Sequence, residues 1–352
     1  MRSIALAATA TAGLLLIGLS CTPHVPIPGN GIYHGAFCDF GSTQDQVSLS
    51  SISDFEALSE KKLAVVGFGN FWGENYFPKD QLDKIREYGA IPLIYWCPWG
   101  QPYDVNEGPW PAYALDTIIS GKYDDYVKAW ADSMKAWGKS VMVALGPEMN
   151  GDLYPWCGDL NGGALLTGYG DPAKADGPER FSDAYRHVLH IVRGQGVRNV
   201  AWVFAPTVVN FSDDWNALRN YYPADSMVDW LGMVAFGFTP EDDEWISFDT
   251  LVGPAYAQID SLNSSKPMML AKWGQAETDD PTIGNKPAWF DTSFASIKSL
   301  YPRLKAAVYW HERVVPDPED PETFYDYRID SSDSALTAYK AGASSSYWLD
   351  RP

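Results

Sequence analysis

The stretch Ser140-Val-Met-Val-Ala-Leu-Gly-Pro-Glu-Met-Asn-Gly-Asp-Leu-Tyr-Pro-Trp156 joins an apolar strand to a loop rich in functional side chains. Residues 141–145 are all apolar and predict a short strand buried on both faces, which the following Gly-Pro pair ends. Behind this pair lie a carboxylate, an amide and two aromatic rings, those of Glu148, Asn150, Tyr154 and Trp156. A carboxylate at the C-terminal end of a buried strand, surrounded by rings, is typical of a sugar-binding cleft. The alternative is a surface glutamate after an ordinary strand end.

The composition limits the classes of ligand. The chain has 352 residues, a formal net charge of −19 and 14% aromatic residues, including 15 Trp and 20 Tyr. Its hydrophobic content of 46% is enough for a large core, and its length fits one large α/β domain or two smaller ones. The negative charge argues against nucleic acid or an anionic membrane surface as the ligand. So many rings indicate a very aromatic core or a carbohydrate-binding surface, because sugar C–H faces pack on rings.

Residues 1–20 predict a secretion signal, because Arg2 is the only charge and an apolar run extends from Ile4 to Leu19. Gly18-Leu19-Ser20-Cys21 resembles a bacterial lipobox, which implies cleavage before Cys21 and a lipid on its thiol. The protein would then be secreted and anchored to a bacterial membrane or cell surface. The alternatives are ordinary secretion and a transmembrane helix, and the helix is disfavoured because the run is short of the roughly 18 apolar residues that a membrane span needs. Residues 21–30 contain three prolines and predict a tether.

Three further cysteines, Cys38, Cys97 and Cys157, would lie in an oxidising compartment. Three thiols allow one disulfide and one free cysteine. All three fall at predicted strand ends on one face of the fold, and we prefer the pair Cys97–Cys157. No CxxC or His/Cys spacing indicates a metal site, so we predict neither a metal nor a cofactor.

Apolar segments alternate with helical patterns along the chain. The strands are predicted at residues 31–38, 63–72, 90–99, 141–145, 200–206, 228–238, 267–274 and 306–311. The helices are predicted at residues 51–62, 78–88, 123–137, 178–193, 215–222, 248–262, 286–300 and 332–340. Continuously apolar strands indicate a parallel sheet, and eight strand–helix units predict a single (β/α)8 TIM barrel over residues 31–345. A doubly wound open sheet is the alternative, but no glycine-rich nucleotide motif follows any strand.

Side chains at the C-terminal ends of barrel strands meet on one face of the barrel. The predicted polar members of this face are Glu148, Asn150 and Lys272. The predicted rings for sugar binding are Trp72, Trp99, Tyr154, Trp156, Phe236, Trp273 and Trp310. The sequence therefore predicts one saccharide site at this end of the barrel.

Several of these segments resemble glycoside hydrolase family 26. Gly-Pro-Glu148-Met-Asn-Gly is similar to the family's His-Glu-Met-Asn-Gly, and further similar segments keep their order, among them Val228-Asp-Trp-Leu-Gly-Met233 and Ala307-Val-Tyr-Trp310. The resemblance covers residues 31–340. It implies a barrel that acts on β-linked polysaccharides, most often β-mannans, by a retaining mechanism with two carboxylates about 5–5.5 Å apart. Glu148 matches the acid/base position of that mechanism.

The nucleophile position departs from the family pattern, because Lys272 stands where the family has glutamate. In the same region Pro147 replaces a histidine and Phe236 replaces a tyrosine. An ammonium group cannot form the glycosyl ester, and it repels a cationic transition state. It would also stabilise the charged form of Glu148, whereas a general acid must carry a proton. We therefore expect a buried Lys272–Glu148 pair.

Three functions follow as alternatives. The first is a monomeric protein that binds a β-linked polysaccharide such as β-mannan with little or no hydrolysis. The second is an active endo-β-mannanase or β-glucanase that uses Glu148 and another carboxylate, for which Glu277 and Glu312 are the candidates, although Glu277 is expected to support a loop. In the third, Lys272 is a single change in an otherwise active enzyme, which Pro147 and Phe236 argue against.

Overall fold

The computed structural model describes residues 25–41, 43–103, 111–209, 211, 213–237, 245–278, 284–315, 322 and 324–352. The predicted signal and Cys21 lie outside these residues, so both stay predictions. In the described part of the predicted tether, Val25 and Pro28 are buried. Within the described ranges, no helix has the length and apolar character needed to cross a membrane.

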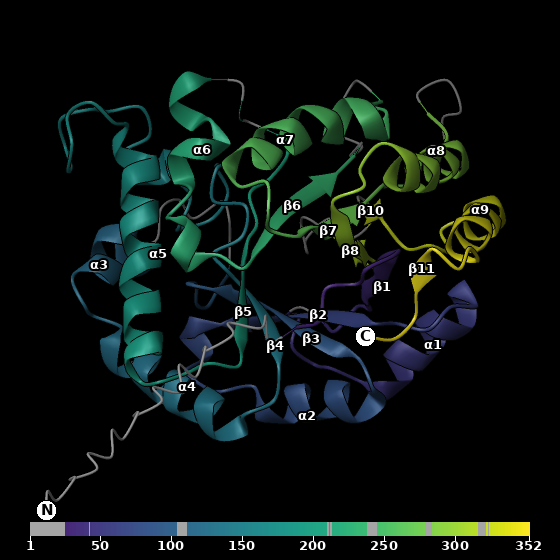
Figure 1. Ribbon diagram of the computed structural model, residues 1–352, viewed down its shortest axis with the longest axis horizontal. Helices are drawn as coiled ribbons and strands as arrows, with labels where there is room; N and C mark the ends of the chain where they lie inside the picture. Colours follow the sequence, from purple (N-terminus) through teal and green to yellow (C-terminus); the bar gives the residue numbers. More distant parts are fainter. Residues whose placement is uncertain are drawn as a thin grey trace, which may run out of the picture.

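Eight parallel strands form a closed barrel (Figure 1). Each strand pairs with the next one in sequence, and the eighth pairs with the first to close the barrel. The strands are β1 (Ile32–Phe37), β2 (Val65–Phe71), β3 (Ile91–Cys97), β4 (Val141–Leu145), β5 (Val200–Phe204), β6 (Trp230–Phe236), β7 (Met268–Gly274) and β8 (Leu304–Trp310). The predicted strands and the predicted single TIM barrel are confirmed.

Helices surround the barrel, as Figure 1 shows. They are α1 (Leu49–Ser59), α2 (Lys79–Tyr88), α3 (Leu115–Ile119), α4 (Asp124–Trp137), α5 (Asp176–Gly194), α6 (Leu218–Tyr221), α7 (Phe248–Leu262), α8 (Lys286–Ser299) and α9 (Asp333–Ala343). Helix α3 was not predicted, because five residues are too few to show helical periodicity. A short ribbon pairs β9 (Arg313–Val314) with β10 (Tyr325–Asp326), and β11 (Trp348–Leu349) adds to β1.

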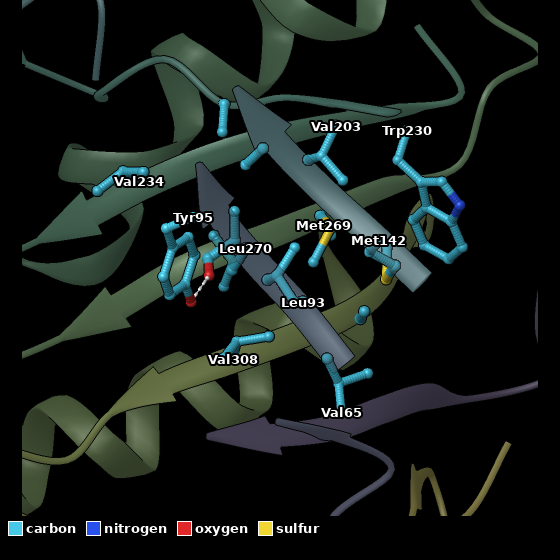
Figure 2. Close-up of a cluster of buried hydrophobic side chains, with 14 of the residues drawn as sticks. Val65, Leu93, Tyr95, Met142, Val203, Trp230, Val234, Met269, Leu270 and Val308 are labelled. Carbon is cyan, nitrogen blue, oxygen red and sulfur yellow. Dashed lines mark hydrogen bonds between the residues drawn. The ribbon is translucent and has the colours of Figure 1, made fainter. Parts of the chain in front are cut away.

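The barrel interior is filled by apolar side chains from facing strands (Figure 2). Tyr95 is the main polar exception, and its hydroxyl donates a hydrogen bond to the carbonyl of Ala271 at 2.7 Å. Its ring fits because position 67 is glycine: a Cβ there would lie 2.5 Å from the Tyr95 hydroxyl. The interior is therefore packed, and the functional face begins above it.

Strand β7 has an irregular register against both of its neighbours. Against β6, Leu270 pairs with Met233 while Lys272 already pairs with Val234. The register against β8 also shifts between Leu270 and Trp273, and together these shifts mark a β-bulge around Ala271. After the bulge, Lys272 faces the barrel and Trp273 faces the helices.

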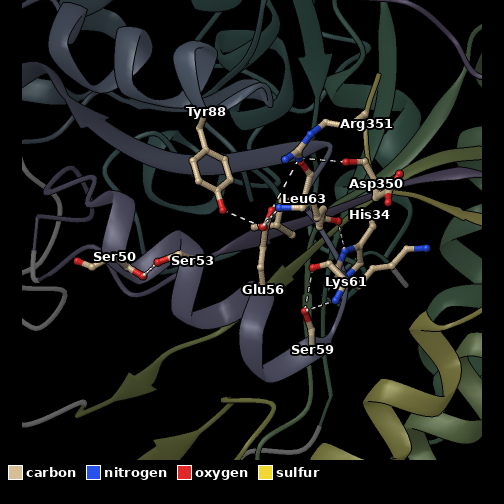
Figure 3. A network of polar contacts seen from close by, with 11 residues as sticks. His34, Ser50, Ser53, Glu56, Ser59, Lys61, Leu63, Tyr88, Asp350 and Arg351 are labelled. Carbon is tan, nitrogen blue, oxygen red and sulfur yellow. Dashed lines mark hydrogen bonds and ion pairs between the residues drawn. The ribbon is translucent and has the colours of Figure 1, made fainter.

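A polar network closes the N-terminal end of the barrel (Figure 3). The buried carboxylate of Glu56, in α1, accepts hydrogen bonds from the Leu63 amide at 2.8 Å and from the Tyr88 hydroxyl at 2.7 Å. Arg351 donates to the Leu63 carbonyl at 2.6 Å. These contacts join α1, α2 and the C-terminal segment far from the C-terminal ends of the strands, so they serve stability.

Substitution of Trp273 tests whether its side chain belongs to the core between the barrel and the helices. It is fully buried between barrel and helices, where its ring lies 5.8 Å from that of Trp289 and 5.1 Å from that of Tyr309. We expect Trp273→Ala to lower the free energy of unfolding by about 3–5 kcal/mol, as large cavities in cores do. Denaturant unfolding measures this. The control is Trp215→Ala, at a partly exposed position, for which we expect less than about 1 kcal/mol. Equal effects of the two changes would contradict the burial of Trp273.

Candidate active site

Glu148 follows β4 and has a left-handed backbone, with a φ of 65°. This conformation is uncommon for a residue other than glycine and often occurs at functional sites. The Glu148 amide donates to the Ala205 carbonyl at 2.8 Å, and the Glu148 carbonyl accepts from the Gly151 amide at 2.9 Å. The end of β5 therefore fixes the direction of the carboxylate.

The carboxylate of Glu148 forms an ion pair with Lys272. The two atoms, Oε1 and Nζ, are 2.9 Å apart, and the side chains are only 14% and 8% exposed. The same ammonium group lies 4.7 Å from the centre of the Tyr95 ring and 4.8 Å from that of the Trp310 ring. Both distances are within the range of cation–π attraction. The expected buried pair is thus present, and one ion and two rings hold the cation.

Glu312 is a second carboxyl group on this face of the barrel. It follows β8, and the indole nitrogen of Trp310 donates to it at 2.8 Å. Burial is the main cause that raises the pKa of Glu312 to about 7, and the negative charge of Asp39 adds to it. The hydrogen bond from Trp310 and the charge of Lys272 act in the opposite direction. Glu312 therefore changes its charge near neutral pH.

Aromatic rings surround these groups. Trp310 stacks on Phe37 with ring centres 4.0 Å apart and planes 9° apart, and Phe236 meets it edge-on at 6.1 Å. On the other side, Trp99 lies edge-on to Tyr154 at 5.5 Å. The charge of Glu148, together with burial, holds the pKa of Tyr154 well above its usual range, so its hydroxyl remains a donor. Of these rings, those of Tyr154 and Phe236 are partly exposed, whereas Trp99 and Trp310 are nearly covered.

Known proteins have sequences similar to that of this chain. Residues 112–278 match the model of glycosyl hydrolase family 26. Endoglucanase H of Acetivibrio thermocellus is 32% identical over 307 residues, which make up 86% of this chain. The chain spans only 30% of the length of that relative. Over residues 112–278 this protein is thus similar to glycosyl hydrolase family 26, and over most of its length it is similar to this endoglucanase.

Solved structures show the same fold. A family 26 β-mannanase from Bacteroides ovatus has 15% sequence identity and a TM-score of 0.61, over 91% of this chain and 90% of that one. A β-mannanase from a symbiotic protist of the termite Reticulitermes speratus, complexed with gluco-manno-oligosaccharide, has 15% identity and a TM-score of 0.57, over 95% and 98%. At such identities the likeness is one of fold.

Three of the predicted sugar-stacking rings are in fact structural in this family 26-like barrel, so those predictions are wrong. Trp273 faces the helices. Trp72 is 2% exposed and packs on Trp96 and on α4. Trp156 is 1% exposed, and its indole nitrogen donates to the Pro147 carbonyl at 2.7 Å. Their position near strand ends was predicted correctly, but the direction of each ring was not.

Asn150 is also structural rather than substrate-binding. Its side-chain nitrogen donates to the carbonyls of Thr207 and Val209 at 3.0 and 3.1 Å, and its oxygen accepts from the Thr207 amide at 2.8 Å. The side chain is buried, and its amide is committed to the loop after β5. Asn150 thereby ties the Glu148 loop to its neighbour.

The predicted Cys97–Cys157 disulfide is not present, since Cys38, Cys97 and Cys157 are all free thiols. The thiol of Cys157 lies 3.4 Å from the Glu148 carbonyl and 3.4 Å from the Tyr154 amide. The thiol of Cys97 lies 3.6 Å from the Tyr95 carbonyl, and burial raises its pKa to about 12. Each thiol packs against backbone near the site instead of against the other.

Glu277, the other candidate second carboxylate, supports a loop as expected. Its carboxylate accepts from the hydroxyls of Ser331 and Ser332, both at 2.8 Å, and so anchors the start of α9. Across the described ranges, no group of three or more His, Cys, Asp or Glu side chains could hold a metal ion. The side chain that best fits a second acid at this face is therefore Glu312.

Sequence reasoning missed Tyr95 and the bulge at Ala271. Tyr95 lies inside β3, next to Trp96, and only its inward direction shows that it contacts Lys272. Its alternation with Leu93 and Cys97 could have indicated that direction. A bulge leaves no comparable pattern in the sequence.

The titration of Glu312 predicts a change in stability with pH. Its pKa of about 7 lies above the ordinary value of 4.5, so the folded chain holds this proton more tightly than the unfolded chain. Stability therefore falls as the pH rises from 4.5 through 7. We expect Glu312→Gln, which keeps an acceptor for Trp310, to lose less stability than the wild type over this range in denaturant unfolding.

The control for this experiment is Asp125→Asn, at a fully exposed side chain. Its stability should follow the wild-type curve with pH. A Glu312→Gln curve parallel to the wild type would show that Glu312 does not take up its proton in this range.

Proposed function

We propose that this family 26-like barrel binds a β-linked polysaccharide such as β-mannan at the C-terminal ends of its strands and hydrolyses it little or not at all. One observation carries the proposal: the Nζ atom of Lys272, which the resemblance to family 26 aligns with the nucleophilic carboxylate, lies 2.9 Å from Oε1 of Glu148. The ligand class is supported by the similar proteins described above. They are an endoglucanase and β-mannanases, one of them complexed with gluco-manno-oligosaccharide.

The same pair favours binding over turnover. A charged carboxylate accepts hydrogen bonds from sugar hydroxyls, and the ammonium group of Lys272 and the hydroxyl of Tyr154 donate them. The partly exposed rings of Tyr154 and Phe236 offer apolar surface to the sugar. Catalysis, however, needs interactions that are stronger in the transition state than in the ground state. A fixed cation beside a developing oxocarbenium ion destabilises the transition state, because the two positive charges repel each other.

Active hydrolysis by an endo-β-mannanase or β-glucanase is the second candidate, and Glu312 is the observation in its favour. When the surroundings of two carboxyl groups give them different pKa values, the group with the higher pKa is usually the acid and the other the charged carboxylate. Glu148 is held beside a cation, while burial raises the pKa of Glu312 to about 7. With these surroundings the proton lies on Glu312, so in this candidate Glu312 would be the acid/base residue and Glu148 the charged carboxylate, the reverse of the role that the resemblance implies for Glu148.

Binding and turnover can be measured on the same samples. We expect calorimetric titration of residues 25–352 with mannan-, glucan- and xylan-derived oligosaccharides to show binding of at least one class. We expect no new reducing ends after a day of incubation. New reducing ends that disappear in Glu312→Gln would instead support the second candidate. Absence of binding to all three classes would refute the proposal.

A glutamate at position 272 tests whether Lys272 alone prevents hydrolysis or whether other residues of the site also prevent it. We expect Lys272→Glu to produce no reducing ends, because Phe236 cannot donate a hydrogen bond to a new carboxylate. It should also unfold at lower denaturant concentration at neutral pH than at pH 4, because two adjacent carboxylates repel each other. The matched comparison is Lys272→Glu combined with Phe236→Tyr. Turnover by the single variant would show that Lys272 alone blocks catalysis.

A further inference from the structure

A groove lies outside the barrel, beside the N-terminal half of α5. It has a volume of about 510 Å³ and is bounded by α5, by the loop before this helix and by the segment that contains η5 (Asp214–Asn216) and α6. Figure 1 shows α5 and α6 on the same side of the molecule. None of the residues that line the groove belongs to the Glu148–Lys272 site.

Trp215 provides a flat apolar surface in this groove. Its side chain is partly exposed, and no other aromatic ring of the described residues packs on it. Asn220 fixes the turn around it, since its side-chain nitrogen donates to the carbonyls of Asp214 and Trp215 at 2.7 and 2.9 Å. On the opposite wall Leu166 is 47% exposed, and the neighbouring Leu165 is 62% exposed. A partly exposed tryptophan ring beside exposed apolar side chains forms an apolar patch, and such patches often mark ligand sites.

The polar groups of the groove carry both signs. Arg219 and Asp214 are exposed and line it, and neither belongs to an ion pair within the described residues. Lys174 and Glu179 face each other at 3.8 Å across another part of the wall. An anion or a cation would meet like charge here, whereas hydroxyl groups can both donate to the guanidinium and accept from or donate to the remaining groups. The surroundings therefore favour a neutral polyhydroxylated ligand.

We propose that this groove is a second saccharide-binding site, in which a neutral pyranose packs on Trp215 and its hydroxyls bond Arg219 and Asp214. This groove is separate from the Glu148–Lys272 site at the C-terminal ends of the strands, which we call the barrel mouth. The proposal does not require any chemistry at the mouth. The two sites are nevertheless neighbours, because Asn216, next to Trp215, donates to the carbonyl of Asn150 at 2.9 Å. The segment that contains Trp215 and Asn216 therefore lines the groove and also holds the loop that carries Glu148.

The experiment uses residues 25–352 with β-1,4-linked mannohexaose and soluble glucomannan, followed by calorimetry and by NMR of the tryptophan indole groups. In the wild type we expect the Trp215 indole signal to shift on addition of either probe. Trp215→Ala should weaken glucomannan binding about three- to tenfold, as the loss of one ring contact does. Trp215→Phe, which keeps a ring, should retain most of the affinity.

A second variant tests the groove without removing the ring. Ala173 is exposed and lines the groove, so Ala173→Leu should obstruct it without disturbing the core. The matched control is Ala136→Leu, on the exposed side of α4, which should bind like the wild type. Binding that is unaffected by both Trp215→Ala and Ala173→Leu would overturn this inference while leaving the mouth as the saccharide site. Binding that is lost in these two variants but not in variants of the mouth would support the groove and refute the proposed function of the mouth.

Discussion

The ion pair between Glu148 and Lys272 is the contact on which the interpretation of this barrel depends. It exists because two strands place opposite charges at one point above a packed interior. The carboxylate is positioned by a left-handed residue whose amide is bound to the end of β5. The ammonium group is aimed inward by a bulge in β7 and lies over two rings. Each ion is nearly buried, so each depends on the other for compensation of its charge.

The surrounding structure supports this pair in layers. Asn150 and the Cys157 thiol hold the loop that carries Glu148, and Tyr95 bonds the carbonyl of the bulge residue itself. The network around Glu56 stabilises the opposite end of the barrel and is independent of the site. Such a separation of a stabilising end from a functional end is general in TIM barrels. It allows the chemistry of one face to change while the fold remains.

The fold was predictable from sequence because each strand is a continuous apolar run and each helix has its own period. The positions of Glu148 and Lys272 at strand ends followed directly. The directions of the rings did not. Trp310 faces the site, whereas Trp273, whose register partner on β8 is Tyr309, faces the helices. A single bulge changes which face a residue occupies, and loop residues such as Trp156 have no periodicity at all. The same limit applies to the cysteines, whose nearness along strand ends did not bring their sulfur atoms together.

The energetics of a buried pair also bear on how such a site could change. Removal of one partner from a buried ion pair costs about 3–5 kcal/mol, because the other charge remains without compensation. A change from lysine to glutamate at position 272 would therefore replace attraction by repulsion. Phe236 would leave the new carboxylate without the donor that a tyrosine supplies. A stable carboxylate at this position would therefore need at least one further substitution beside it. Binding of a ligand at such a pair would not require a nucleophile, so recognition and catalysis depend on different groups of the face.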